Sequence, residues 1–280
     1  MTDRERYRPF TGDSETRVRL QTAPLELVLF QLRWPELAYL QSENLTPIAQ
    51  AFGMTLSEYP LYSSTPEMTF SVGPTGVQQH EVGTVHQWSS IDRKRHVSLG
   101  RTFLSIYTQD YPGWPDFAEH LRAVLDLLQA NVDIRYVERV GVRYLNRIAD
   151  PELMERLGEL VTPQVLGYQS LPRAASADVV LLQNLNQAQF SVGGGILQVR
   201  SGVMAPGTTL DPSVAPVSGP SWILDIDAMI EVNTAFDLEE VLAQAGRMSD
   251  AAYDFFKFII KTGFIDQFGT RTPDADSDPA

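Results

Sequence analysis

Apolar and polar residues alternate along several stretches of this chain, and in other stretches apolar residues recur every three or four positions. Alternation places side chains on the two faces of a strand, whereas the longer period places them on one face of a helix. These patterns predict strands within 24–34, 67–82, 85–111, 132–148, 178–204 and 220–231. They predict helices at 43–52, 114–129 and 151–160, and a terminal helix containing 249–261 that ends at Gly263.

Turn residues join these elements. A Gly73-Pro74-Thr75-Gly76 turn is expected between two strands, and the run Gly193-Gly194-Gly195 also joins two strands. A glycine run that leads into a strand, rather than opening a helix, favours a hairpin turn over a dinucleotide fingerprint.

The order of the elements predicts an α+β protein with a mostly antiparallel sheet and helices on one face. The stretches 22–131 and 132–268 each run strand, helix, three strands, helix. We therefore expect a single domain over 22–268, built from two pseudo-related β-α-β-β-β-α halves. Residues 1–21 are expected to be a flexible N-terminal arm, and 269–280 an acidic disordered tail. The Pro- and Gly-rich segment 205–220 is expected to be a mobile loop between two strands.

Composition narrows the classes of function. The 280 residues carry 22 Lys and Arg against 35 Asp and Glu, for a net charge of −13, which argues against binding to duplex nucleic acid. The chain has no cysteine, which removes disulfides and thiolate metal sites. Its start lacks the apolar region of a secretory signal, and no run is long enough to span a membrane. We expect a cytoplasmic protein that does not bind membranes.

Several catalytic machineries leave no trace in the sequence. There is no Gly-x4-Gly-Lys-Ser/Thr loop, no Gly-x-Ser-x-Gly elbow and no His-Glu-x-x-His pair. His80 and His86 share one face of a predicted strand, but two histidines without a nearby carboxylate at ligand spacing favour exposed strand residues over a metal site.

Arginines recur every fourth residue along the strand predicted at 132–148. A spacing of four returns each side chain to the same face, so the arginines lie opposite an apolar face. Asn146 belongs to that opposite face, together with Val140, Val142 and Tyr144. The arginines of the row are Arg135, Arg139, Arg143 and Arg147.

Acidic residues form a counterpart to this row. Asp225, Asp227 and Glu231 share one face of the strand predicted at 220–231. Glu26 lies inside the apolar strand 24–34, where a carboxylate has to be paired or exposed at the strand end. We favour its pairing with an arginine over a role as a base or ligand contact.

Three interpretations of these charges stay open. The favoured one is a charge ladder between neighbouring strands. The second is a binding surface, in which Arg139, Arg143, Asn146, Arg147 and Glu26 contact a partner protein or a compact anionic ligand. The third places Mg²⁺ at Asp225 and Asp227, for an enzyme that acts on a phosphorylated or nucleotide-like substrate.

Five blocks of the sequence also carry a resemblance to a known family. They are APLELVLFQLRW, YPGWPDF, VERVGVRYLNRI, WILDID and AYDFFKFII, and the likeness runs from about 23 to 268. They resemble a sporadically distributed, largely uncharacterised family of prokaryotic proteins, in which Arg143-Tyr144-Leu145-Asn146-Arg147-Ile148 is the most specific match. The resemblance implies no activity or cofactor. The scattered distribution of the family suggests mobile genes such as those of phage defence.

From these observations we expect a non-catalytic binding or accessory protein without a cofactor. It would engage a partner protein or a compact anionic ligand through a face of its sheet, and it is compatible with a homo-oligomer. The alternative is the Mg²⁺-dependent enzyme just described.

Overall fold

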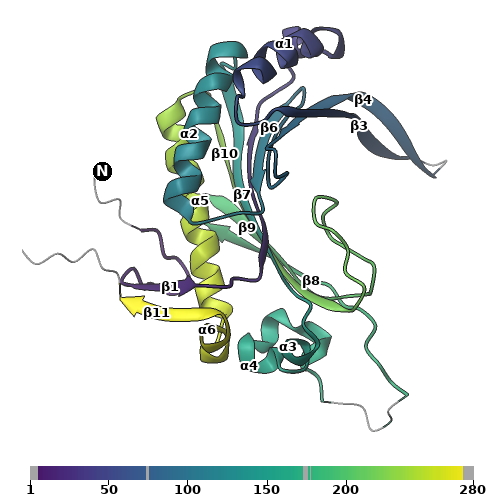
Figure 1. Cartoon of the computed structure of the whole chain (residues 1–280), viewed down its shortest axis with the longest axis vertical. Coiled ribbons are helices and arrows are strands. Elements are labelled where there is room, and N and C mark those ends of the chain that lie inside the picture. The colour runs from purple at the N-terminus through teal and green to yellow at the C-terminus, as the bar shows by residue number, and fades with distance from the viewer. Residues whose placement is uncertain (1–5, 74–75, 173–175, 177, 274–280) are drawn as a thin grey trace, which may run out of the picture. The chain divides into compact units, whose positions relative to one another are not determined.

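The computed structural model describes residues 6–73, 76–172, 176 and 178–273 (Figure 1). Eleven strands are named in these residues. They are β1 (Thr16–Leu20), β2 (Leu25–Arg33), β3 (Leu61–Gly73), β4 (Gly76–Ser89), β5 (Arg95–Leu99), β6 (Phe103–Thr108), β7 (Tyr136–Ile148), β8 (Asn186–Val192), β9 (Gly195–Met204), β10 (Ser221–Ala235) and β11 (Gly269–Pro273).

The α-helices are α1 (Ser42–Thr55), α2 (Trp114–Asn131), α3 (Pro151–Glu155), α4 (Leu157–Leu160), α5 (Leu238–Ile259) and α6 (Thr262–Phe268). Short 3₁₀ helices occupy Ala38–Leu40, Pro163–Val165 and Gly167–Ser170. In the described part of the chain, no helix is both long and apolar enough to cross a membrane.

The main sheet contains nine strands in the order β3-β4-β5-β6-β2-β7-β10-β9-β8. Its registers are antiparallel for β2–β6, β3–β4, β4–β5, β5–β6 and β8–β9. This is the α+β fold with a mostly antiparallel sheet that the sequence predicts. Next to β2 come β6, β5, β4 and β3, and next to β7 come β10, β9 and β8. In both halves, therefore, the strand that is last in sequence lies next to β2 or β7, and the earlier strands lie progressively farther out. The first half has four strands between its helices, where three were expected.

The contacts between residues divide the described chain into two compact units. Unit 1 draws on Met1–Leu27, Arg143–Ala228 and Arg247–Ala280, and unit 2 on Val28–Val142 and Met229–Gly246. These units do not follow the sequential halves that the element order predicts. Strands β2, β7 and β10 and helix α5 each contribute residues to both units.

Unit 2 contains the helix whose apolar face is predicted most completely. Helix α2 begins with a proline in its first turn, and its buried residues are the five apolar positions with helical spacing in the sequence. They are Phe117, Leu121, Val124, Leu125 and Leu128. In β2, Phe30 and Leu32 are fully buried. The hairpin β3–β4 closes between Gly73 and Gly76, and the other two residues of its predicted turn lie outside the described residues.

Unit 1 is built around buried side chains of β10 and α5. Trp222, Leu224 and Ile226 of β10 are buried, and Tyr144 of β7 shares a hydrogen bond of 2.7 Å with Ser249 of α5. The apolar face of β7 therefore faces the helix, as the alternation of its residues predicts. The hairpin β8–β9 turns through Gly193 (φ 57°) and Gly194 (φ 87°), which confirms the predicted glycine turn.

Residues near both ends of the described chain make contacts that the composition does not suggest. Thr16–Leu20 of the expected arm forms β1, which pairs with β11 from the expected tail. Before β1, the buried carboxylate of Asp254 accepts hydrogen bonds from the amides of Phe10 (2.6 Å) and Thr11 (3.0 Å). These residues of the expected arm therefore have partners more than two hundred residues away in sequence.

Gly263 does not end the terminal helix. Helix α5 begins earlier than predicted and ends at Ile259, and Gly263 lies inside α6. A Cβ atom on Gly263 would lie 2.7 Å from the carbonyl oxygen of Glu159 in α4. The glycine is therefore needed for the close approach of two helices rather than for a turn.

Candidate functional site

The arginine row and its acidic neighbours form the candidate site in unit 1. Arg143 and Arg147 of β7 point to the face opposite Tyr144, as their spacing predicts. Arg143 donates from Nε to Oδ1 of Asp225 at 2.7 Å and from Nη2 to Oδ2 at 3.3 Å. Its third nitrogen, Nη1, donates to Oδ2 of Asp211 at 2.5 Å. Both acidic partners of one guanidinium therefore come from outside β7.

Asp225 is shared between two arginines. Arg200 of β9 donates from Nε to Oδ2 of Asp225 at 2.8 Å and from Nη2 to the same oxygen at 2.5 Å. The side chain of Asp225 is only 1% exposed. We call Arg143, Arg200, Asp211 and Asp225 the guanidinium–carboxylate network. It joins β7, β10 and β9, which are neighbours in the sheet.

The pKa values in this network follow from opposing effects. Burial alone would lower the pKa of the Arg143 guanidinium, but hydrogen bonds and charges from Asp225 and Asp211 raise that pKa above its usual range. Burial would likewise raise the pKa of Asp211, but the Ser213 amide and Arg143 hold that pKa below its usual value. The ionised forms of both groups are therefore favoured in the fold.

A second ion pair continues the row. Arg147 donates from Nε and Nη2 to Oε1 of Glu26 at 3.1 and 3.0 Å, and from Nη1 to the carbonyl oxygen of Ala215 at 2.7 Å. The prediction that Glu26 pairs with an arginine is confirmed. Glu26 lies near the start of β2, and about a third of its side chain is exposed.

Asn146, Arg135 and Arg139 contact groups outside this network. Asn146 is 5% exposed and donates to the carbonyl oxygen of Leu224 at 3.5 Å. Arg135 is exposed and pairs with Asp133 at 2.9 Å. In unit 2, Arg139 donates to Oε1 of Gln31 at 2.6 Å and contacts the sulfur of Met229 at 3.6 Å. Asp227, two residues after Asp225, is half-buried.

Two members of the network, Asp211 and Arg200, are absent from the sequence prediction. Asp211 lies in the segment 205–220, which we expected to be a mobile loop. The structure anchors this segment through Asp211, the buried Val214 and the carbonyl of Ala215. A local signal was present, because an aspartate between Thr209 and Ser213 can accept from the backbone nearby, as Asp211 does from Ser213 at 2.9 Å. Arg200 is the only charged residue of β9.

The charges of the site balance. Arg143, Arg147 and Arg200 are matched by Asp211, Asp225 and Glu26. The ladder interpretation therefore agrees with the contacts of these residues, while anion binding by the row stays a prediction.

Metal binding at Asp225 and Asp227 also stays a prediction. Both carboxylate oxygens of Asp225 accept hydrogen bonds from guanidinium groups. Within the described ranges, no group of three or more His, Cys, Asp or Glu residues is arranged to hold a metal ion.

His86 in unit 2 differs from the expected exposed strand histidine. It is 2% exposed, its Nδ1 shares a hydrogen bond of 2.9 Å with Tyr62, and its ring stacks against Trp88. Burial lowers the pKa of His86, which favours its neutral form. His80 is exposed, as predicted.

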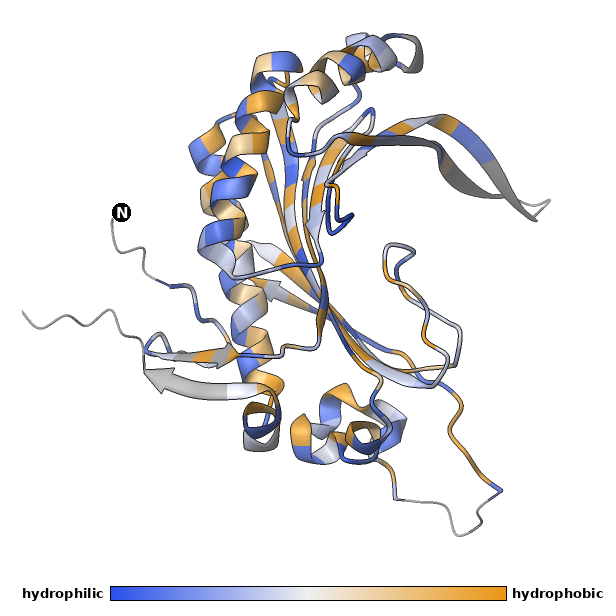
Figure 2. Ribbon diagram, viewed as in Figure 1, coloured by the Kyte–Doolittle hydropathy of each residue, from blue (hydrophilic) through white to orange (hydrophobic). Residues whose placement is uncertain are grey.

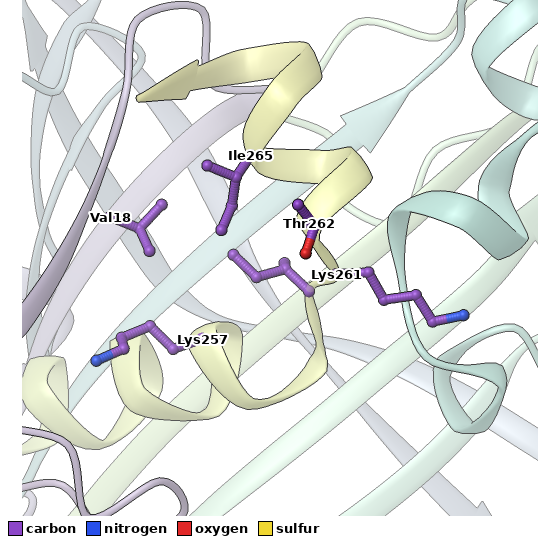
Figure 3. A pocket seen from close by; sticks show the side chains of 6 residues that line it. Val18, Lys257, Lys261, Thr262 and Ile265 are labelled. Atoms are coloured by element: carbon purple, nitrogen blue, oxygen red, sulfur yellow. The ribbon is translucent and has the colours of Figure 1, made fainter. Parts of the chain in front are cut away.

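Unit 1 also has a pocket of about 260 Å³, lined by Val18, Lys257, Ile260, Lys261, Thr262 and Ile265. Figure 3 shows that the amino groups of both lysines point away from it. Lys257 donates to Asp13 at 2.9 Å and Lys261 to the carbonyl of Gly158 at 2.6 Å. The lysines line the pocket with their aliphatic stems, so it offers no ammonium group to an anion.

Comparison with protein-family models and with curated proteins found no match for this chain. The resemblance carried by the Arg143–Ile148 motif therefore stays a prediction.

Proposed function

We propose that the protein is a non-catalytic binding protein that holds a partner protein along the open edge of β8. The observation that carries this proposal is a long stretch without charge, which is largely exposed as far as Ser191. Residues 179–199 contain no Asp, Glu, Lys or Arg, and they form the longest such run in the chain, ahead of 44–57. We call residues 179–199 the uncharged edge.

The uncharged edge exposes large apolar side chains to solvent. Leu182 is 74% exposed, and Val179 and Val180 are each 68% exposed. Leu181, Leu185, Phe190 and Ile196 are exposed as well. Figure 2 shows the segment before β8 as a mainly orange trace. Single exposed apolar residues are normal, but a group of this size typically marks an interaction surface.

The backbone of β8 supports the same function. It is the last strand in the sheet order, and five successive residues, from Gln187 to Ser191, are exposed. Within the described residues, no other strand pairs with its outer side. An unpaired edge offers amide and carbonyl groups to an extended segment of another chain, and apolar side chains beside it add affinity.

The guanidinium–carboxylate network supports this arrangement mechanically. Through Asp225 it ties β9, the strand that pairs with β8, to β10 and β7. Buried ion pairs contribute little net stability, but they fix the position of the groups that they join. In this proposal the arginines hold the strands behind the binding edge and do not contact the partner.

Site-specific photo-crosslinking tests the proposal. A photoreactive phenylalanine analogue replaces Leu182 or Ile196 in the full chain, in its native cells, and replaces Met54 of α1 (84% exposed) as the control. We expect covalent protein adducts at 182 and 196 but not at 54. The proposal fails if neither edge position gives adducts, or if position 54 gives the same ones.

A role in a mobile or phage-defence system is suggested by the family resemblance alone and stays a prediction. Binding of a compact anionic ligand, which the arginine row suggests, also stays a prediction, and each arginine of the site in unit 1 already has an acidic partner.

A further inference from the structure

We infer that the partner at the uncharged edge is a second copy of this chain, paired antiparallel along β8. This inference rests on the proposed function, because it names the occupant of the same edge. A twofold axis between two copies brings the same strand of each copy together, so the edge has to be complementary to itself.

Charge favours a second copy at this position. Each chain carries a net charge of −13, so two copies repel each other over most of their surfaces. Along residues 179–199 no charged side chain faces its counterpart, whatever the register of pairing. At the open side of β8 (Asn186–Val192), two copies can therefore pair without like charges in opposition.

The side chains of β8 suit pairing about its central residue, Gln189. With the twofold axis at Gln189, Ala188 of each copy lies opposite Phe190 of the other, so a small residue faces a large one. Phe190 already packs against Phe10 (5.5 Å) and Phe255 (5.6 Å), which fixes its ring on that face. Cross-strand pairs of this kind stabilise a sheet.

The opposite face of β8 is polar but uncharged. Gln189 donates to Gln198 of β9 at 3.0 Å, and Gln187 and Ser191 flank it on the same face. On the twofold axis Gln189 faces its own counterpart, where two amide side chains can exchange hydrogen bonds. The exposed residues 179–185 lead directly into β8, so they add apolar surface at the start of this strand.

A charge exchange at Gln189 tests the inference. In Gln189→Lys or Gln189→Glu, two like charges face each other across the axis, and a 1:1 mixture of the two variants restores an opposite pair. Because Gln189 is exposed, neither substitution should disturb the monomer. Gln50→Lys, on an exposed residue of α1, is the control for added charge.

Sedimentation velocity over roughly a hundredfold range of protein concentration gives the readout. We expect the unsubstituted chain and Gln50→Lys to dimerise, each Gln189 variant alone to dimerise at least about tenfold more weakly, and their mixture to recover the dimer. A chain that stays monomeric throughout overturns the inference. So do Gln189 variants that each dimerise as the unsubstituted chain does.

The crosslinking experiment separates this inference from the proposed function. Adducts at Leu182 that contain only a foreign protein, together with a monomeric chain, overturn the second copy and leave a binding edge. The absence of any adduct overturns both.

Discussion

The two outermost strands of the sheet, β3 and β8, occupy corresponding places in the two halves but are built differently. Strand β3 carries Pro66 and Glu67 near its middle, and its register with β4 shifts between Glu67 and Met68. Strand β8 has no proline, no charge and an unbroken register with β9. Proline, charge and irregular register are the usual means by which proteins prevent pairing at a sheet edge.

The difference indicates that a shared position in the fold does not fix the role of a strand. In β3 the proline removes an amide donor, and the glutamate adds a carboxylate that is 20% exposed and lies 3.9 Å from Nε of Arg101. In β8 these features are missing and large apolar side chains are exposed nearby. Substitutions at Asp225, at Asp211, at Pro66 with Glu67 and at Glu26 test which residues produce this contrast.

The largest effect is expected from Asp225→Ala. It leaves Arg143 and Arg200 in largely buried positions without their shared carboxylate, and removing one partner from a buried pair costs about 3–5 kcal/mol. We expect a lower free energy of unfolding in urea. Hydrogen exchange should accelerate in β8 and β9 while β3 and β4 stay protected.

The exposed Glu231→Ala, on the same strand, is the control for Asp225→Ala and should change stability by less than about 0.5 kcal/mol. Adding Arg143→Ala to Asp225→Ala should cost less than the sum of the two single changes, since both remove the same contact. Full additivity would contradict the network.

The next largest effect on stability is expected from Asp211→Asn, and it depends on pH. Because the pKa of Asp211 is lowered in the fold, its stabilising contribution is present above the unfolded pKa of about 3.9 and is lost as pH falls through the lower folded pKa. Asp211→Asn should cost about 1–3 kcal/mol at neutral pH, and this difference from the unsubstituted chain should shrink in acid.

Urea unfolding at neutral and acidic pH measures the effect of Asp211→Asn. The control is Asp116→Asn, on an exposed residue of α2, which measures the effect of losing one carboxylate outside the network. A difference that stays constant with pH would mean that the ionised carboxylate of Asp211 does not anchor the segment 205–220.

A smaller change in stability, but a measurable increase in association between chains, is expected when β3 loses its proline and its glutamate. In the double variant Pro66→Thr and Glu67→Thr, the strand regains an amide donor and loses its charge. We expect species larger than those of the unsubstituted chain in sedimentation velocity. Stability should fall by about 1–2 kcal/mol, because Glu67 is only 20% exposed and pairs with Arg101, which keeps Glu36 as a second partner.

The same dipeptide occurs at Pro151-Glu152 in α3, where both residues are exposed, so Pro151→Thr with Glu152→Thr is a matched control. If the β3 variant shows no additional association, proline and charge do not protect this edge.

The smallest effect is expected from Glu26→Gln. Arg147 is only 7% exposed, but the carboxylate of Glu26 is a third exposed. The amide oxygen of glutamine can still accept from the guanidinium, so the loss should be about 0–1 kcal/mol. Arg147 also keeps its hydrogen bond to Ala215. Urea unfolding should therefore shift only slightly, and dimerisation should not change. A loss above about 2 kcal/mol would place Glu26 among the strongly coupled groups of the site.

Local patterns account for what the sequence predicts well. The apolar face of α2, the two faces of β7 and the Gly193-Gly194 turn each follow from residues close together in the chain. The pairing of Glu26 with an arginine also follows, because a carboxylate inside an apolar strand needs a partner.

The missed features depend on distant segments. The pairing of β1 with β11, the contact of Gly263 with Glu159 and the anchoring of Asp211 by Arg143 join residues far apart in sequence. Five-residue strands such as β1 give little periodic signal, and the local signal at Asp211 indicates a turn but not a distant arginine partner. For the same reason, Arg200 and Asp211 could not be assigned to the site from the sequence.

The division of β2, β7, β10 and α5 between the two units has a genetic consequence. Each unit is assembled from separate stretches of the chain, so no continuous gene fragment encodes either one. A cut between Val142 and Arg143 severs β7 itself. Recombination therefore cannot exchange one unit as a cassette, and laboratory dissection of this protein has to proceed by substitution rather than by truncation.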